Sequence, residues 1–148
     1  MTPKPVQPDE RERVDVAAYD VSASAGYGVV ASDYPEISDI MTFPRGYLRA
    51  FTRASPSDLA IIRVKGDSMT PTLADDDVVM VDMSKTNLGY DGLFVLVFDG
   101  ALHVKRIARG SRSGAILIQS DNERYRPIER SFEDVQVVGK VIWKGTRE

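Results

Sequence analysis

Short runs of β-branched and apolar residues, separated by glycine and aspartate turns, dominate the chain from residue 59 onward. Such runs are typical of buried strands, and none of them has the periodicity of a long amphipathic helix. Asp99-Gly100 separates two of the runs and predicts a tight hairpin, because this dipeptide accepts positive φ angles. Asp91-Gly92, Gly110 and Gly114 mark further turns. The expected strands are residues 59–65, 78–83, 93–98, 101–108, 115–119 and 135–143.

The pattern before residue 59 is weaker. Residues 14–21 (VDVAAYDV) predict a strand, whereas residues 22–28 (SASAGYG) are small and predict a flexible loop. Residues 33–43 are expected to be irregular. Pro44 is expected to start a short helix, PRGYLRAF, because proline is tolerated in the first helical turn. The fold class predicted from these elements is mostly β, with one or two short helices.

Composition limits the organisation and the location of the protein. With 148 residues and a formal net charge of −3, the chain is expected to form one domain without a strong attraction to a nucleic-acid backbone. Residues 1–13 carry three prolines and alternating charges, as in a flexible linker or tail, which leaves residues 14–148 as the predicted domain. The chain has no cysteine, no signal peptide and no apolar run of membrane-spanning length. We therefore expect a cytoplasmic protein with no membrane partner.

Ser68, in the sequence RVKGDSMTPTL, admits two interpretations. A serine after a strand is most often a turn or helix-capping residue. Ser68 is alternatively a nucleophile, in which case it needs a base to take its proton.

Two side chains compete as that base. His103 is the chain's single histidine. Lys105 lies two residues further along the same apolar run and, by strand alternation, on the same face as His103 and Ile107. Burial would lower the pKa of Lys105 and make its amine a base, whereas a lysine that extends to solvent from a strand edge would stay protonated. The spacing of these residues leaves both interpretations open.

Two further clusters resemble known sites but lack the necessary partners. Ser120-Asp121-Asn122 resembles a β-lactamase motif, but no Ser-x-x-Lys motif accompanies it. Asp75, Asp76 and Asp77 lack calcium-loop spacing and are expected to form a solvated turn rather than a metal site. We therefore expect neither a metal nor a cofactor.

Taken together, the blocks VKGDSMTPTL, DDDVVMVD, HVKRI, SDNERYRPI and VVGKVIW resemble, in composition and order, the LexA-like autopeptidases of the S24 peptidase family. This family comprises the C-terminal domains of LexA and of phage repressors of the lambda-repressor type, and the UmuD-like proteins. The resemblance covers about residues 14–144. It implies a compact, strongly bent sheet shared with signal peptidases.

The resemblance also implies roles for individual residues. Ser68 matches the family's nucleophile and Lys105 its general base, which leaves His103 outside the mechanism. The scissile bond of the family matches Ala25-Gly26, and the oxyanion is expected at the backbone N–H groups of Asp67 and Ser68. Most relatives have Gly-Asp where this chain has Asp76-Asp77, so we expect a left-handed turn without glycine.

The family resemblance further implies partners and a biological role. We expect the C-terminal, dimerising and self-cleaving part of a prophage-type repressor, whose cleavage is favoured by a RecA filament on single-stranded DNA. Operator DNA would be bound by a helix-turn-helix upstream, which this chain does not contain. Two alternatives are a UmuD-like accessory subunit of a translesion polymerase and a catalytically silent dimerisation module. Relatives dimerise through the part that corresponds to residues 135–143.

Overall fold

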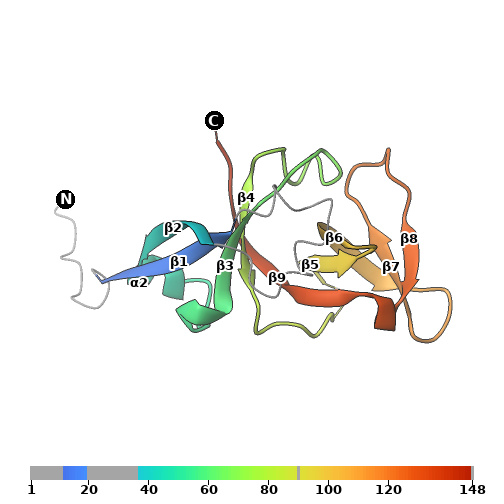
Figure 1. Cartoon of the computed structure of the whole chain (residues 1–148), viewed down its shortest axis with the longest axis horizontal. Coiled ribbons are helices and arrows are strands. Elements are labelled where there is room, and N and C mark those ends of the chain that lie inside the picture. Colours follow the sequence, from blue (N-terminus) through green and yellow to red (C-terminus); the bar gives the residue numbers. More distant parts are fainter. Residues whose placement is uncertain (1–11, 20–36, 90, 148) are drawn as a thin grey trace, which may run out of the picture.

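The computed structural model describes residues 12–19, 37–89 and 91–147 of the chain (Figure 1). Strands account for about half of these residues, and one short α-helix and two 3-10 helices connect them. The elements are β1 (Arg13–Tyr19), β2 (Ile37–Pro44), α2 (Arg45–Arg49), η1 (Pro56–Asp58), β3 (Leu59–Arg63), β4 (Val78–Asp82), β5 (Leu93–Phe98), β6 (Ala101–Arg109), β7 (Ala115–Gln119), β8 (Ile128–Ser131), η2 (Phe132–Asp134) and β9 (Gln136–Gly145).

The strands form one nine-stranded sheet in the order β2-β1-β3-β4-β9-β5-β6-β7-β8. Strand β9 joins its two halves, because its C-terminal part pairs with β4 and its N-terminal part with β5 (Figure 1). The register shifts by one residue in each pairing, at Val138 and at Ile142 of β9. Because extra residues of this kind bend and twist a strand, β9 is where the sheet acquires much of its curvature.

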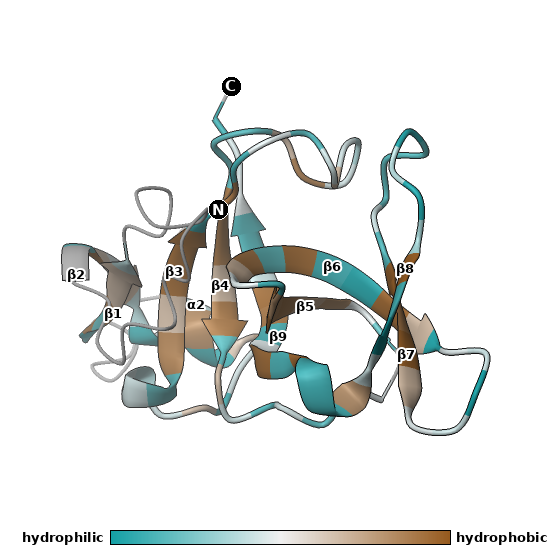
Figure 2. Ribbon diagram, turned by 45° about the vertical axis from the view of Figure 1, so that its right-hand side comes forward, coloured by the Kyte–Doolittle hydropathy of each residue, from teal (hydrophilic) through white to brown (hydrophobic). Residues whose placement is uncertain are grey.

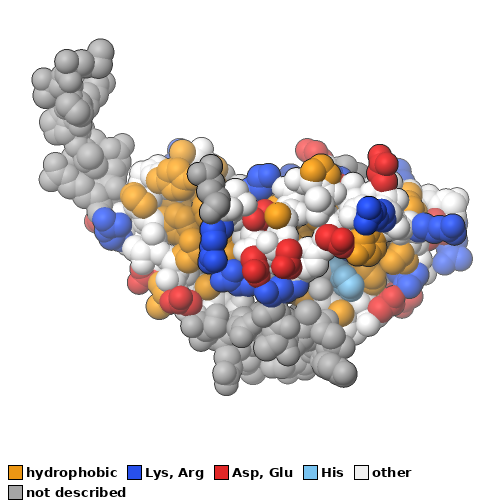
Figure 3. Space-filling view, turned by 90° about the horizontal axis from the view of Figure 1, so that it is seen from above, with side chains coloured by type: hydrophobic (Ala, Val, Ile, Leu, Met, Phe, Trp, Pro, Cys, Tyr) orange, Lys and Arg blue, Asp and Glu red, His pale blue; other side chains and the backbone are white. Residues whose placement is uncertain are grey.

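Three clusters of buried apolar residues lie along the bent sheet. One packs between β1, β2, α2, β3 and β4, the second around the loop after β3, and the third between β5, β6, β7 and the segment before β9. Figure 2 shows the hydrophobic residues of β3 and β4 in contrast to the largely hydrophilic loops. Figure 3 shows Lys and Arg side chains interspersed with Asp and Glu over the centre of one face. No helix in the described part of the chain has the length and apolar character needed to span a membrane.

The mostly β prediction is confirmed, and the apolar runs after residue 59 all form strands. Asp99 and Gly100 form the predicted hairpin turn with φ angles of 50° and 77°, and Asp76 has a φ of 72° in a turn without glycine. The helix predicted after Pro44 covers Arg45–Arg49. The expectation that residues 33–43 are irregular is wrong for its C-terminal part, because β2 pairs there with β1. Strand β8 was not predicted.

The close approach of β4 and β9 at Gly139 yields a stability prediction. A Cβ atom at Gly139 would lie 2.4 Å from the backbone oxygen of Asp82 and 2.8 Å from Cγ1 of Val81. Since the nearest of these atoms belongs to the backbone of a paired strand, it cannot move aside cheaply. Gly139→Ala is therefore expected to lower the free energy of unfolding by about 1–3 kcal/mol, measured by urea denaturation at fixed protein concentration.

Gly100→Asn is the matched control, because a Cβ at Gly100 meets open space and asparagine tolerates its positive φ. A Gly139→Ala protein as stable as this control would contradict the close approach of the two strands.

Candidate active site

Ser68 lies in the loop that connects β3 with β4, at the upper side of Figure 1. The ends of the loop are joined by two backbone hydrogen bonds, in which Val64 donates to Asp77 over 2.8 Å and Asp76 donates to Val64 over 2.9 Å. Met69 and Leu73 of the same loop are buried in the central apolar cluster. The loop is thus closed at its base and packed against the sheet, so Ser68 has a defined position.

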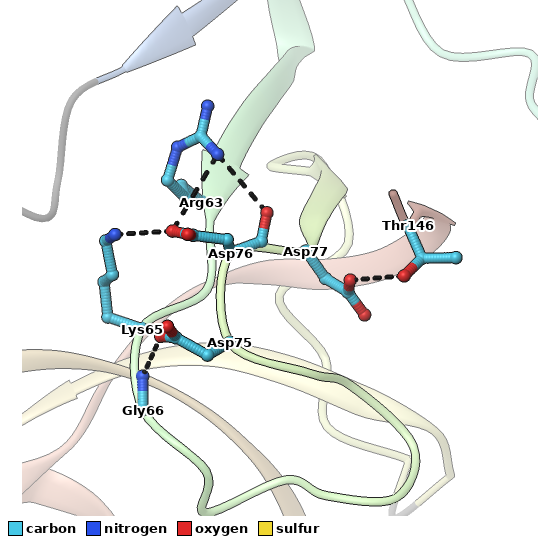
Figure 4. Close-up of polar contacts among 7 residues, drawn as sticks. All are labelled: Arg63, Lys65, Gly66, Asp75, Asp76, Asp77 and Thr146. Atoms are coloured by element: carbon cyan, nitrogen blue, oxygen red, sulfur yellow. Dashed lines mark hydrogen bonds and ion pairs between the residues drawn. The ribbon is translucent and has the colours of Figure 1, made fainter. Parts of the chain in front are cut away.

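The three aspartates that precede β4 hold the base of this loop (Figure 4). Asp75 accepts a 2.7 Å hydrogen bond from the backbone N–H of Gly66, and Asp76 pairs with Lys65 over 2.5 Å. Asp77 accepts hydrogen bonds from Thr146 and from the backbone N–H of Ala74, and both lower the pKa of its carboxyl group.

The expectation of a solvated turn is therefore wrong for Asp77, which is buried, while Asp75 and Asp76 are exposed. Asp77 is tied into the structure because it joins the loop to the C-terminal segment. Within the described residues, no group of three or more metal-ligating side chains is found.

The structure brings Ser68 and Lys105 together. The distance between Nζ of Lys105 and Oγ of Ser68 is 2.9 Å, although the residues are 37 positions apart in the sequence. Lys105 also donates a 2.8 Å hydrogen bond to Oγ of Ser120, which follows β7. Both interpretations of Ser68 therefore have support. Its hydroxyl contacts an amine, and its backbone lies in the turn that Thr70 closes by donating a hydrogen bond to the carbonyl of Asp67.

Lys105 is buried, with 8% of its surface exposed, so the interpretation of a lysine extending to solvent is wrong. Burial lowers the pKa of its ammonium group, because the charged form loses hydration. The strand register makes Phe94, which is buried, its direct cross-strand neighbour on the same face. The side chain of Lys105 thus begins among apolar groups and ends at the two serine hydroxyls.

Val79, Val81, Leu93 and Val95, on the neighbouring strands, belong to the apolar cluster around the loop after β3, whereas Phe94 belongs to the cluster between β5, β6 and β7. Leu93 and Val95 pair with Arg106 and Val104, which face away from Lys105 by strand alternation. Which face of β5 and β6 surrounds Lys105 depends on the bend of the sheet, and the pattern of apolar residues alone does not specify that bend.

His103 is separate from the serine hydroxyl. Its ring stacks on Phe98 with 4.1 Å between ring centroids, and burial followed by the charge of Lys105 lowers the pKa of its imidazole. Among the described residues, Ser68 forms no hydrogen bond with His103, so the contact that a general base requires is made by Lys105.

Asn122 holds the backbone around Ser68. The backbone N–H of Asn122 donates a 2.9 Å hydrogen bond to the carbonyl oxygen of Ser68. Its side-chain amide donates another of 2.9 Å to the carbonyl oxygen of Asp67. In the described part of the chain, the N–H groups of Asp67 and Ser68 donate to no acceptor. Asn122 thus holds the carbonyl groups of Asp67 and Ser68, the two residues whose N–H groups are predicted to bind an oxyanion.

Tyr125 completes this side of the site. Its hydroxyl donates to the carboxylate of Asp67, which raises the pKa of the phenol, and its ring centroid lies 5.8 Å from Nζ of Lys105. Sequence reasoning missed Ser120, Asn122 and Tyr125 as site residues. Ser120 and Asn122 belong both to the motif that resembles a β-lactamase and to the block SDNERYRPI, but neither likeness predicted a contact with Lys105 or with the backbone of Ser68. The predicted scissile residues, Ala25 and Gly26, lie outside the described residues.

Comparison with known proteins places the chain in a family. Residues 17–142 match the family described as peptidase S24-like. The chain belongs to this family. This S24-like chain is similar to the 26 kDa repressor protein of Escherichia phage HK022, with 33% identity over 135 residues, 88% of the chain and 56% of the relative.

Two further relatives are regulators. The HTH-type transcriptional regulator PrtR of Pseudomonas aeruginosa is 30% identical over 145 residues, 94% of this chain and 56% of the relative. The LexA repressor of Caldicellulosiruptor saccharolyticus is 31% identical over 121 residues, 80% and 53% of the two chains. The S24-like chain thus spans about half the length of these curated relatives.

The lowered pKa of Lys105 predicts how stability depends on pH. Between this pKa and the ordinary lysine value of about 10.4, the unfolded chain binds the proton that the folded chain has lost. The free energy of unfolding of a Ser68→Ala protein is therefore expected to gain a contribution that rises with pH through this interval. In Ser68→Ala/Lys105→Met this contribution is absent, so the stability difference between the two proteins changes with pH.

Denaturant titrations of both proteins across the alkaline range measure this difference. Stability curves that stay parallel through the whole range would show that Lys105 keeps an ordinary pKa in the folded protein.

Proposed function

We propose that this chain is the self-cleaving and dimerising domain of a prophage-type transcriptional repressor. The observation that carries the proposal is the 2.9 Å contact between the Ser68 hydroxyl and the buried Lys105 amine. A lysine acts as a base at moderate pH only when its ammonium form is disfavoured, and burial does this here. Serine with lysine is a known variant of the serine-protease arrangement.

In the proposed reaction, neutral Lys105 takes the Ser68 proton as Oγ attacks the carbonyl carbon of Ala25. The oxyanion that forms is stabilised by the backbone N–H groups of Asp67 and Ser68, which Asn122 holds in place. Collapse of the intermediate breaks the bond to Gly26, whose amine leaves with the proton from Lys105. Water then hydrolyses the ester between Ala25 and Ser68, with Lys105 again as base, and frees the serine.

The target of this reaction lies in the same chain. An intramolecular attack has an effective molarity of up to about 10⁵–10⁸ M, so it needs no recognition of a separate substrate. Such reactivity must be controlled, and we place the control in docking of the segment around Ala25-Gly26. A RecA filament on single-stranded DNA is the partner that would favour docking, so cleavage would relieve repression after DNA damage.

Operator binding belongs to another part of the protein. The formal net charge of −3 gives this chain no general attraction to a DNA backbone. Relatives named as repressors or as HTH-type regulators are about twice as long as the matched region. We therefore place the operator contacts in an upstream helix-turn-helix.

The relatives are named as repressors and transcriptional regulators. Their names therefore favour a repressor over the alternative of a polymerase accessory subunit. The alternative of a silent dimerisation module is opposed by the contact between Ser68 and Lys105, because a module without chemistry needs no buried amine at a serine hydroxyl.

The proposal predicts cleavage between Ala25 and Gly26 that accelerates as the pH rises and Lys105 loses its proton. Protein held at mildly alkaline pH should yield a fragment beginning at Gly26, detected by mass spectrometry. Ser68→Ala and Lys105→Ala should slow its appearance by about 100-fold or more, because each removes a group that acts in the chemical step.

His103→Ala is the matched control, because it replaces another side chain of the same strand face and should cleave at nearly the parent rate. Cleavage of the Ser68→Ala or Lys105→Ala protein at the parent rate would exclude the proposed pair.

Dimerisation is proposed to use β9. Its apolar side chains Val137, Val138, Val141 and Ile142 are only half-buried within one chain, so a second copy can cover them further. Sedimentation at micromolar concentration should give twice the chain mass of 16.4 kDa. Ile142→Asp should shift the protein toward the monomer, whereas Ile40→Asp, at an exposed apolar residue of β2, should not. A parent protein that sediments only as a monomer would contradict this assignment.

A further inference from the structure

We propose that Ser120 is a positioning residue that orients the Lys105 amine toward Ser68 and sets the pH at which that amine becomes a base. The inference rests on the proposed self-cleavage and adds a third side chain to it. It starts from a contact that the Ser–Lys pair does not require, the 2.8 Å hydrogen bond from Nζ of Lys105 to Oγ of Ser120.

The register of β6 and β7 explains how Ser120 reaches the amine. Ile107 pairs with Ile118, and alternation puts Lys105 and Ser120 on this same face, one step further along the two strands. Nζ of Lys105 therefore lies between two hydroxyls, 2.9 Å from Ser68 and 2.8 Å from Ser120. These are its two hydrogen-bond partners among the described residues.

The chemistry of a neutral amine gives the two contacts different roles. Neutral lysine has two N–H bonds and one lone pair, and the lone pair must point at the proton of Ser68 for transfer. An N–H bond donated to Ser120 restricts rotation of the amine and leaves the lone pair free to face Ser68. Once the proton has moved, the ammonium group donates to Ser120 more strongly, because hydrogen bonds from charged donors are stronger.

Ser120 is itself held in place by its neighbours. Asp121 accepts two hydrogen bonds from Arg106, of 2.7 and 3.2 Å, and another from Thr72 of the nucleophile loop. Asn122 is bonded to the backbone of Asp67 and Ser68. The segment from Ser120 to Asn122 thus contacts the base, the strand that carries the base and the loop that carries the nucleophile. Because it is bonded both to Lys105 and to the backbone of Ser68, this segment fixes the distance between the two residues.

The proposal predicts a rate effect and a pH effect for Ser120→Ala. Loss of the acceptor lets the amine rotate, and a small displacement of a reacting group can cost up to about 100-fold in rate. Loss of the same acceptor also destabilises the ammonium form, so the pKa of Lys105 falls further. The rise of the cleavage rate with pH should therefore have its midpoint at a lower pH than in the parent, with a rate plateau at least about 10-fold lower.

Cleavage rates across pH are measured by mass spectrometry for the parent and for three variants. Ser120→Thr keeps the acceptor and should restore most of the rate and the parent midpoint. Ser111→Ala is the matched control, because Ser111 lies at the other end of the hairpin between β6 and β7, where it bonds to Glu129. It should leave both the rate and the midpoint unchanged. A Ser120→Ala protein with the parent's rate and midpoint, or with a slower rate at an unchanged midpoint, would overturn the proposal.

A readout without cleavage separates this proposal from the proposed function. In the Ser68→Ala background, acetylation of Lys105 is followed across pH by mass spectrometry with and without Ser120→Ala. Its midpoint should shift to lower pH when Ser120 is replaced, and an unchanged midpoint would overturn the role of Ser120. Failure of the parent to cleave at any pH would instead count against the proposed function and leave this midpoint as the test of Ser120.

Discussion

The burial of one lysine amine against a serine hydroxyl is the constraint around which the site is built. An ammonium group in water keeps its proton well above neutral pH and cannot act as a base. Strand β6 carries Lys105 beside the buried Phe94, where the amine has lost most of its hydration and its pKa is lowered, as the proposed role of base requires. The amine stays at this depth because Ser68 and Ser120 bond to it, so the polar group is buried with partners.

The bent sheet brings these partners to one place. Ser68 comes from the loop between β3 and β4, and Ser120 from the loop after β7, on opposite sides of β9 in the strand order. The C-terminal end of β9 and the residue after it also support the loop that carries Ser68. Lys144 donates to the carbonyl of Thr72, and Thr146 donates to the carboxylate of Asp77. The strand proposed to form the dimer is thus tied to the loop that carries Ser68, so the proposed assembly and the proposed chemistry depend on one structural element.

The sequence was informative where a structure depends on local pattern. The apolar runs of β3, β4 and β5 became strands because nearly all their side chains are buried, on both faces of the sheet. Asp99-Gly100 became a hairpin because both residues adopt positive φ. Strand β2 was not predicted because it is an edge strand in which Asp39 and Thr42 are interspersed with apolar residues. Strand β8 was not predicted because it is short and polar. The pairing of Ser68 with Lys105 was expected from family resemblance, since spacing left His103 as a competitor. Neither spacing nor resemblance indicated Ser120 and Asn122, because their roles depend on how two distant loops meet.

Nitrogen NMR titration of the Lys105 side chain in the Ser68→Ala protein tests the central claim most directly. The account predicts that the Nζ signal titrates well below the ordinary lysine pKa of about 10.4, because the amine is buried. It also predicts that the cleavage rate of the parent protein rises with a midpoint below this ordinary lysine value. A Lys105 that titrates at the ordinary lysine value would contradict the account, since the buried amine would then be a protonated group rather than the base for Ser68.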